Sequence, residues 1–445
     1  MANSYKVGML SLGCAKNQVD GEVLMASLRD KGFELSDDVG ICDIAIVNTC
    51  GFIDSAKQES IEEILELITL KNEGRIKKVV VTGCLAERYK EEIMKDIPEV
   101  DGVFGIGANG ELGDKLYEMM EKGKLESFPD KYLMPLSGNR VLTTPSYYAY
   151  LKIAEGCDNC CTYCAIPEIR GKFRSRPIED IVQEAEALVA NGAKELNIIA
   201  QDTSRYGLDI YGKFALSELL SELCQLKNLK WIRILYCYPD TITDELLEVM
   251  AKEEKIVKYM DIPLQHASGR VLKKMNRRGD RESLTALINK IRDKVPGIIL
   301  RTTFIAGFPG ETEEDFEELC EFVKEMKFDR MGCFAYSQEE GTPAALLPDQ
   351  IDEDVKEHRA ELVYDLQQRI TEQKNESYIG KTIEVMTEGF DRYAECYFGR
   401  SAMDAPDVDG KIFFSFNERR PGYGQIVKVL IEDAMDCDLT GSMVD

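Results

Sequence analysis

Residues 148–164 of this 445-residue chain read YAYLKIAEGCDNCCTYC, an apolar run followed at once by four cysteines. The run Tyr148–Ala154 is typical of a buried parallel strand. Cys157, Cys161 and Cys164 then give the spacing C-x3-C-x2-C on the following loop, where three thiolates can converge on one metal centre. Because the chemistry of β/α barrels takes place at the carboxyl ends of their strands, this order of elements predicts a metal site at a barrel mouth.

Two kinds of metal centre fit the cysteine loop. Thiolate ligands favour an iron–sulfur cluster, and three of them leave one iron of a four-iron cube open to a small molecule. Cys160 also makes the loop read C-x2-C-C-x2-C, which resembles a four-thiolate zinc site. Adjacent Cys160 and Cys161 point in different directions, however, so joint ligation of one ion is awkward. We favour the three-thiolate cluster, with structural zinc as the alternative.

The residues around this loop alternate between strand and helix patterns. Further candidate strands lie at 195–200, 231–237, 257–262, 298–305 and 331–337. An amphipathic helix over 178–189, with Gly192 as its stop, is typical of the segments between them. Six strands with crossovers of this length predict a complete or partial (β/α) barrel over residues 147–375, ending in a long helix at about 352–374.

Two further domains are predicted on either side of the barrel. In residues 1–125, apolar runs at 5–12, 44–48 and 79–82 alternate with helical patterns, such as the stripe of Ile61, Ile64, Leu65 and Ile68. This alternation favours an open, doubly wound α/β sheet. Residues 126–146 contain proline and glycine without a clear period and are predicted to be a linker. Residues 376–445 contain five short candidate strands, at 382–387, 394–398, 411–416, 426–431 and 439–444, and predict a small antiparallel β-barrel.

A second set of three cysteines lies in the N-terminal domain. Cys14, Cys50 and Cys84 each follow one of its candidate strands, and each has a glycine beside it. Carboxyl ends of parallel strands share one edge of a sheet, and glycine allows the backbone to approach a bulky inorganic centre closely. One such cysteine is most often a small core residue. Three at equivalent strand ends favour a second three-thiolate cluster.

Composition narrows the functional classes. The chain has 55 basic and 80 acidic residues, a net charge of −25, which suits a basic protein partner or small molecules better than nucleic acid. It has no apolar run near the ~20 residues that span a bilayer and no secretory signal at its start. We therefore expect a cytoplasmic protein with no membrane contact, in which 14 cysteines indicate metal or redox chemistry rather than disulfides. Of only two histidines, His266 is expected to be structural and His358 has no assigned role.

With these residues in view, the chain resembles the radical S-adenosylmethionine methylthiotransferases over nearly its whole length. The resemblance rests on Tyr163 before the last cysteine of the loop, on the three N-terminal cysteines, and on a C-terminal barrel of the TRAM type. Segments 200–203, 261–266 and 304–312 also look like family blocks. The superfamily's Gly-Gly-Glu-type motif is absent, and residues 197–202 stand in its place.

The resemblance implies S-adenosylmethionine and two 4Fe–4S clusters. The cluster on Cys157, Cys161 and Cys164 would bind S-adenosylmethionine, whose one-electron reduction gives a 5′-deoxyadenosyl radical that abstracts hydrogen from the substrate carbon. The cluster on the N-terminal cysteines would supply the methylthio group. Tyr163 would contact the adenosine, and Gln201, Asp202 and Gly307 would shape the cofactor pocket, although Gln201 and Asp202 equally fit a helix N-cap turn. No side chain is assigned as the catalytic group.

Within the family, residues 399–410 resemble the branch that modifies ribosomal protein S-twelve. That branch implies methylthiolation of an aspartate β-carbon, on the free or ribosome-bound protein, with an external electron donor and no direct nucleic-acid substrate. The final domain holds 14 acidic and 7 basic residues, which suits recognition of a basic ribosomal protein. The alternatives are a transfer-RNA adenosine methylthiotransferase, a non-catalytic iron–sulfur electron carrier, and a zinc-stabilised binding protein.

Overall fold

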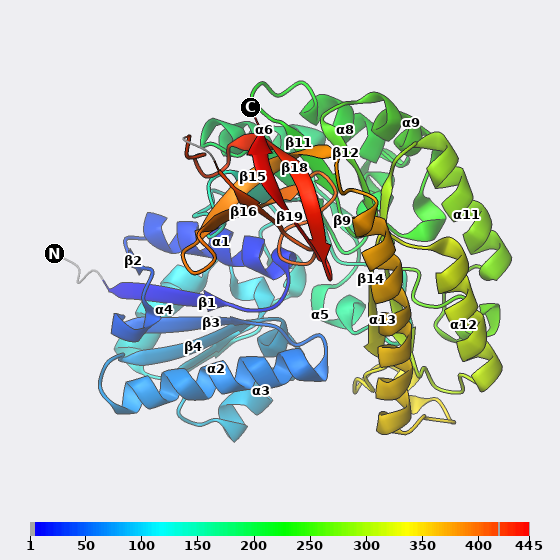
Figure 1. The fold of residues 1–445 in the computed structure, drawn as a ribbon. Coiled ribbons are helices and arrows are strands. Elements are labelled where there is room, and N and C mark those ends of the chain that lie inside the picture. The colour runs from blue at the N-terminus through cyan, green and yellow to red at the C-terminus, as the bar shows by residue number, and fades with distance from the viewer. Residues whose placement is uncertain (1–4, 417–418, 445) are drawn as a thin grey trace.

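The N-terminal domain is a parallel sheet covered by helices on both faces. We describe residues 5–416 and 419–444 of a computed structural model (Figure 1). The sheet has the order β2-β1-β3-β4-β5-β6. Its strands are β1 (Lys6–Ser11), β2 (Glu34–Ser36), β3 (Ile44–Thr49), β4 (Lys78–Gly83), β5 (Gly102–Phe104) and β6 (Leu125–Ser127). Core residues of α1 (Ala15–Asp30) and α4 (Leu112–Lys122) pack on one face, and those of α2 (Asp54–Asn72) and α3 (Cys84–Asp96) pack on the other. The doubly wound arrangement is as predicted.

Two details of this domain differ from the sequence prediction. In α2, Ile64 and Ile68 are buried, but Ile61 and Leu65 are 39% and 49% exposed, so only half of the predicted apolar stripe faces the core. The sheet also continues to Ser127 through β6, into the segment predicted to be a linker. The β5–β6 pairing places this strand at the edge, where three residues suffice.

The central domain is an open six-stranded sheet, which is a partial barrel. The sheet order is β14-β13-β12-β11-β10-β7, with parallel neighbours throughout. The strands are β7 (Tyr148–Lys152), β10 (Glu195–Ile199), β11 (Trp231–Ile234), β12 (Ile256–Asp261), β13 (Ile299–Ala306) and β14 (Arg330–Ala335). The helices are α5 (Ile166–Arg170), α6 (Ile178–Ala190), α7 (Leu208–Tyr211), α8 (Leu216–Leu223), α9 (Asp244–Lys252), α10 (Gly269–Lys274), α11 (Arg281–Lys294), α12 (Glu313–Met326) and α13 (Glu353–Glu376). A short hairpin of β8 (Ala154–Glu155) and β9 (Arg174–Ser175) follows β7.

The C-terminal domain is a closed five-stranded barrel. Its order is β15-β16-β17-β19-β18, antiparallel except for the pair β17–β19. The strands are β15 (Thr382–Asp391), β16 (Cys396–Ser401), β17 (Ile412–Ser415), β18 (Ile426–Met435) and β19 (Asp438–Val444). In the described residues the predicted small barrel is confirmed, but the prediction that all its strand pairs are antiparallel is wrong for β17–β19, which is parallel.

The loop after β16 docks this barrel onto the concave side of the central sheet. Asp404 lies 2.6 Å from Arg330, and Asp409 lies 2.6 Å from Arg301. Arg400 is buried and lies 2.6 Å from Glu195, the first residue of β10. These partners lie at or near the amino ends of the central strands, opposite the end that carries the cysteine loop.

Candidate functional site

The three N-terminal cysteines lie at one edge of their sheet. Cys14 and Cys50 follow β1 and β3, and Cys84 is the first residue of α3, directly after β4. These three strands are parallel neighbours, so their carboxyl ends meet. The neighbouring glycines stand where space is tight: a Cβ at Gly13 would lie 2.8 Å from Cys50 Sγ, and one at Gly83 would meet the Thr49 backbone. Glycine here lets the strand-end loops pack on each other.

The residues around this trio shift the pKa of the Cys84 thiol in opposite directions. Burial raises the pKa of the Cys84 thiol to about 12, and the nearby Cys14 and Cys50 contribute to that rise. One cation opposes this effect, because Arg170 Nη2 lies 3.1 Å from Cys84 Sγ. Arg170 is therefore the cation that favours the thiolate form of Cys84.

The second trio lies on the loop between β8 and α5. Burial raises the pKa of Cys157 to about 12 and that of Cys164 well above its ordinary value, and both respond to Cys161. The loop is held by Cys164 N–H donating to Cys161 O at 3.0 Å. Arg277 is the cation at this trio, with Nη1 3.8 Å from Cys161 Sγ. Cys160 is exposed and has a φ of 50°, whereas Cys157, Cys161 and Cys164 are partly buried.

Both trios offer thiolates, which are the usual ligands of iron–sulfur clusters. Among residues 5–416 and 419–444, no three cysteine, histidine, aspartate or glutamate side chains lie close enough together to hold one metal ion. A four-iron cube binds each thiolate through a different iron and therefore spaces the sulfur atoms more widely than a single ion does. The zinc alternative thus finds no support in this part of the chain.

A single short helix separates the two trios. Cys84 packs against Ala165 and Ile169, and Ala165 directly follows Cys164. Arg170, at the end of α5, forms an ion pair with Asp20 of α1 and lies 3.4 Å from Glu155. Lys152 completes this buried group by pairing with Asp20 and Glu155. Cys84 of the N-terminal trio and the segment that follows the second trio therefore meet at α5.

The structure gives the four predicted cofactor residues different surroundings. Tyr163 is packed edge-on against Phe308, and its hydroxyl accepts from Arg277 at 3.5 Å. Gln201 Nε2 donates to Glu155 Oε1 at 2.7 Å, whereas its Oε1 is buried with no partner among the residues that the structure describes, as are both amide atoms of Asn197. Unpaired buried polar atoms of this kind suit a site that binds a polar cofactor.

Asp202 and Gly307 both have structural roles in the fold. Asp202 caps a short 3-10 helix and accepts from Asn159 at 2.8 Å, which ties the cysteine loop to the segment after β10. Gly307 donates its N–H to Glu311 at 2.9 Å, and a Cβ there would lie 2.2 Å from Lys356. His266 is buried, with Nδ1 accepting from Ser268 N–H at 2.9 Å and Nε2 3.3 Å from Glu311 Oε2.

The sequence analysis did not predict several charged residues that lie where the N-terminal and central domains meet. Lys16, Glu155, Arg170 and Arg277 are all buried beside the two trios. In the sequence, only their closeness to the cysteine motifs sets these residues apart. With 55 basic and 80 acidic residues in the chain, many charged residues lie near a cysteine by chance, so this signal does not identify them.

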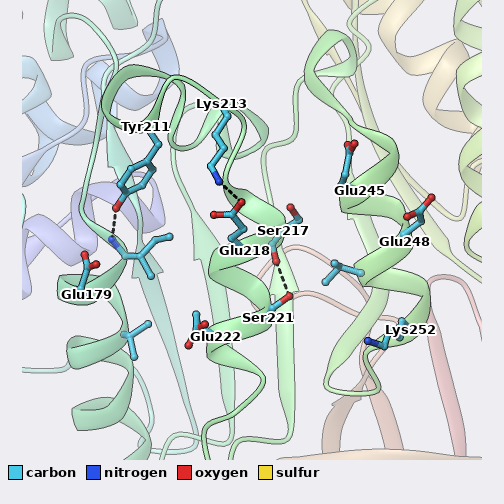
Figure 2. Close-up of a pocket in the computed structure, with 13 residues that line it drawn as sticks. Glu179, Tyr211, Lys213, Ser217, Glu218, Ser221, Glu222, Glu245, Glu248 and Lys252 are labelled. Atoms are coloured by element: carbon cyan, nitrogen blue, oxygen red, sulfur yellow. Dashed lines mark hydrogen bonds and ion pairs between the residues drawn. The ribbon is translucent and has the colours of Figure 1, made fainter.

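A second depression lies away from the barrel mouth. It is a groove of about 850 Å³ between α6, α8 and α9 (Figure 2). Glutamates dominate its lining, and Lys213 pairs with Glu218 at 2.5 Å. It contains none of the predicted site residues.

No helix in the described part of the chain is both long and apolar enough to cross a membrane.

Comparisons with known proteins agree with this division of the chain. Residues 6–105 match the family described as "Uncharacterized protein family UPF0004", residues 151–323 match the Radical SAM superfamily, and residues 379–444 match the TRAM domain. A "Ribosomal protein uS12 methylthiotransferase RimO" of Pelotomaculum thermopropionicum is 51% identical over 443 residues, 99% of each chain. The protein of the same name from Clostridioides difficile is 48% identical over 440 residues, again 99% of each.

Solved structures share the fold at much lower identity. The radical S-adenosylmethionine methyltransferase TsrM of Kitasatospora setae, solved with cobalamin and a [4Fe-4S] cluster, gives a TM-score of 0.59 at 17% identity over 77% of each chain. The cobalamin-dependent S-adenosylmethionine radical enzyme OxsB gives 0.51 at 14% identity, covering 83% of this chain and 56% of that one. These likenesses concern the fold alone.

Proposed function

This chain belongs to the family of ribosomal protein uS12 methylthiotransferases, and we propose that it replaces one hydrogen on the β-carbon of a uS12 aspartate with a methylthio group. It is a radical S-adenosylmethionine enzyme. Cleavage of an unactivated C–H bond exceeds what side-chain acids and bases achieve, so cofactors carry that step. The chain's own residues hold the cofactors and the substrate carbon together.

In this proposal the enzyme uses S-adenosylmethionine and two 4Fe–4S clusters. Cys157, Cys161 and Cys164 would hold one cluster, and Cys14, Cys50 and Cys84 would hold the other. When bound, these groups supply a hydrogen-abstracting adenosyl radical and the sulfur, and an external donor supplies the electron. Gln201 and Asn197 carry the unpaired amide atoms available to S-adenosylmethionine.

The contact of Cys84 with Ala165 and Ile169 carries the proposal. Hydrogen removal and sulfur delivery must reach the same carbon, so both centres must border one small space. A separation of one five-residue helix meets that need. An electron carrier needs no such common space for a third molecule.

The test is an anaerobic assay of the reconstituted chain with S-adenosylmethionine and a reductant. Purified uS12, small ribosomal subunits and transfer RNA are offered separately, and each product is analysed by mass spectrometry. We expect uS12 to gain one methylthio group in place of one hydrogen at an aspartate. Product on transfer RNA alone would assign the adenosine reaction instead. Cluster reduction without cleavage of S-adenosylmethionine would indicate an electron carrier.

A further inference from the structure

Lys16 is a buried cation with no carboxylate partner in the part of the chain that the structure describes. It is the second residue of α1, two positions after Cys14, and only 8% of its surface is exposed. Its ammonium lies 3.3 Å from the centroid of the Tyr236 ring. Among the described residues, no carboxylate lies within ion-pair distance of it, and Asp261 is the only carboxylate that acts on it, after Tyr236 and the Cys14 thiol.

Asp261 is already committed to other partners. Its Oδ2 accepts from Tyr236 N–H at 3.1 Å, and its Oδ1 lies 3.9 Å from Arg301 Nε. The cation–π contact with Tyr236 offsets only part of the cost of burying an ammonium group. Within the described part of the chain, Lys16 thus has no carboxylate paired with its buried ammonium group.

Other buried cations of the same junction differ from Lys16 in this respect. Lys152 pairs with Asp20 and Glu155, and Arg140 pairs with Glu22 at 2.5 Å. Lys16 also stands in the first turn of α1, which contains no acidic residue. A positive charge at the positive end of a helix is unfavourable unless an anion joins it. The position is therefore suited to a ligand that brings a negative charge.

Tyr236 holds the ammonium at the barrel mouth. It follows β11 with a φ of 62°, a backbone conformation that is costly for an aromatic residue. Its carbonyl accepts from Thr203 N–H at 2.9 Å, so the loops after β10 and β11 fix it from both sides. Ala15 and Val19 of α1 pack into the same apolar cluster as Leu235. The Lys16 side chain is consequently clamped between the segment that carries Cys14 and the mouth of the partial barrel.

We infer that Lys16 binds the side-chain carboxylate of the substrate aspartate and thereby sets the enzyme's preference for an acidic residue. The inference rests on the proposed function, because it takes the aspartate β-carbon as the reacting atom. The carboxylate is bonded directly to that carbon, so a cation beside Cys14 and the barrel mouth holds the carbon between the two centres. An adenine base carries no negative charge and would leave Lys16 unpaired.

The experiment compares two peptides from uS12 that carry the target aspartate or an asparagine in its place. Their dissociation constants are measured by fluorescence anisotropy under anaerobic conditions, with cluster-loaded enzyme and S-adenosylmethionine. We expect the wild type to bind the aspartate peptide about tenfold or more tightly than the asparagine peptide, as charge-assisted hydrogen bonds do. Lys16→Met should bind both peptides equally, and Lys16→Arg should retain a preference. Lys31→Met, which changes an exposed lysine of the same N-terminal domain, is the matched control.

Three results would overturn the inference. The first is equal binding of the two peptides by the wild type. The second is a preference for the aspartate peptide that is unchanged in Lys16→Met. The third is a Lys16→Met protein that differs from the wild type only in the electron paramagnetic resonance spectrum of its clusters. The first needs no variant, so it applies even if Lys16→Met folds poorly. Methylthiolation of uS12 by the wild type is measured alongside. If that product forms while the aspartate preference is independent of Lys16, this inference fails and the proposed function stands.

Discussion

Arg170 Nη2 lies 3.1 Å from Cys84 Sγ, although the two residues are 86 positions apart. The same guanidinium donates to Asn17 Oδ1 at 3.1 Å and pairs with Asp20, both on α1. Arg170 belongs to α5, which directly follows the cysteine loop of the central domain. One buried side chain therefore joins the two cysteine trios and fixes how the domains that carry them meet.

Replacing Arg170 by methionine should weaken this junction. Among the described residues, Asp20 and Glu155 would keep Lys152 as their only paired cation, and removal of one member of a buried ion pair costs about 3–5 kcal/mol. We expect the free energy of unfolding, measured by urea denaturation, to fall by that amount, with loss of iron from the N-terminal centre. Lys172→Met changes an exposed cation two residues away and should shift stability by less than about 0.5 kcal/mol. Equal stability of the two variants would contradict the role given to Arg170.

Iron content distinguishes the two centres. Wild type reconstituted anaerobically should hold about eight irons, and Cys157→Ala and Cys14→Ala should each hold about four, because each loses one cube. Both variants should also lose methylthiolation, since the centres have separate tasks.

Cys160→Ala serves as the matched control for this count. Cys160 is exposed, whereas Cys157, Cys161 and Cys164 are partly buried, and it lies outside the C-x3-C-x2-C spacing, so its variant should keep all the iron. A loss of half the iron in Cys160→Ala would show that this thiol is a ligand and that the three-thiolate assignment is wrong.

The long apolar runs predicted most of the fold. β7, β10, β13 and β14 lie within one or two residues of their predicted limits, because buried parallel strands are continuous apolar segments. Short edge strands carry no comparable signal. β2 (Glu34–Ser36) is three residues long and mostly polar, and its pairing with β1 depends on the sheet that is already present.

Only those parts of the candidate site that follow from spacing along the chain and from strand order could be predicted. The C-x3-C-x2-C loop and the strand-end cysteines are readable because their positions follow from motif and topology. The contact of Cys84 with Ile169 and the burial of Lys16 under Tyr236 join segments far apart in the chain. Such contacts depend on domain docking, which hydrophobic periodicity does not encode.

Residues 399–410 are a further case in which contacts between domains could not be predicted from the sequence. From sequence they mark a branch of the family, yet Arg400, Asp404 and Asp409 are occupied by partners in the central domain. These charges hold the barrel in place, so they are not free to meet a substrate while the domains stay docked. Recognition by charge must use the exposed acidic residues of the barrel.

Arg400→Met should therefore loosen the C-terminal barrel and leave the clusters intact. The change leaves Glu388 unpaired and removes one of two partners of Glu195, at a cost of about 3–5 kcal/mol. We expect a lower thermal midpoint and faster proteolysis between the domains, with iron content unchanged. Lys428→Met, an exposed change on the same barrel, should do neither. Loss of iron in Arg400→Met would show that the two ends of the central sheet are coupled.

The remaining question for the barrel is whether its exposed acids attract the basic substrate. Glu384 and Glu432 are exposed on β15 and β18. Reversing both to lysine should slow association with full-length uS12 several-fold at low salt, because opposite charges steer encounter. The effect should vanish at about 1 M salt, where screening acts within about 3 Å. A short peptide around the target aspartate should bind unchanged.

Glu222→Lys with Glu245→Lys provides the matched control, since it changes the net charge equally in the groove of Figure 2. Stopped-flow association rates at several salt concentrations measure both pairs. If the barrel pair alone slows association, local charge on the barrel guides uS12. Equal slowing would assign the effect to the net charge of −25 as a whole. Slowing by the groove pair alone would move the docking surface to α8 and α9, because only there would the reversed charges meet the incoming protein.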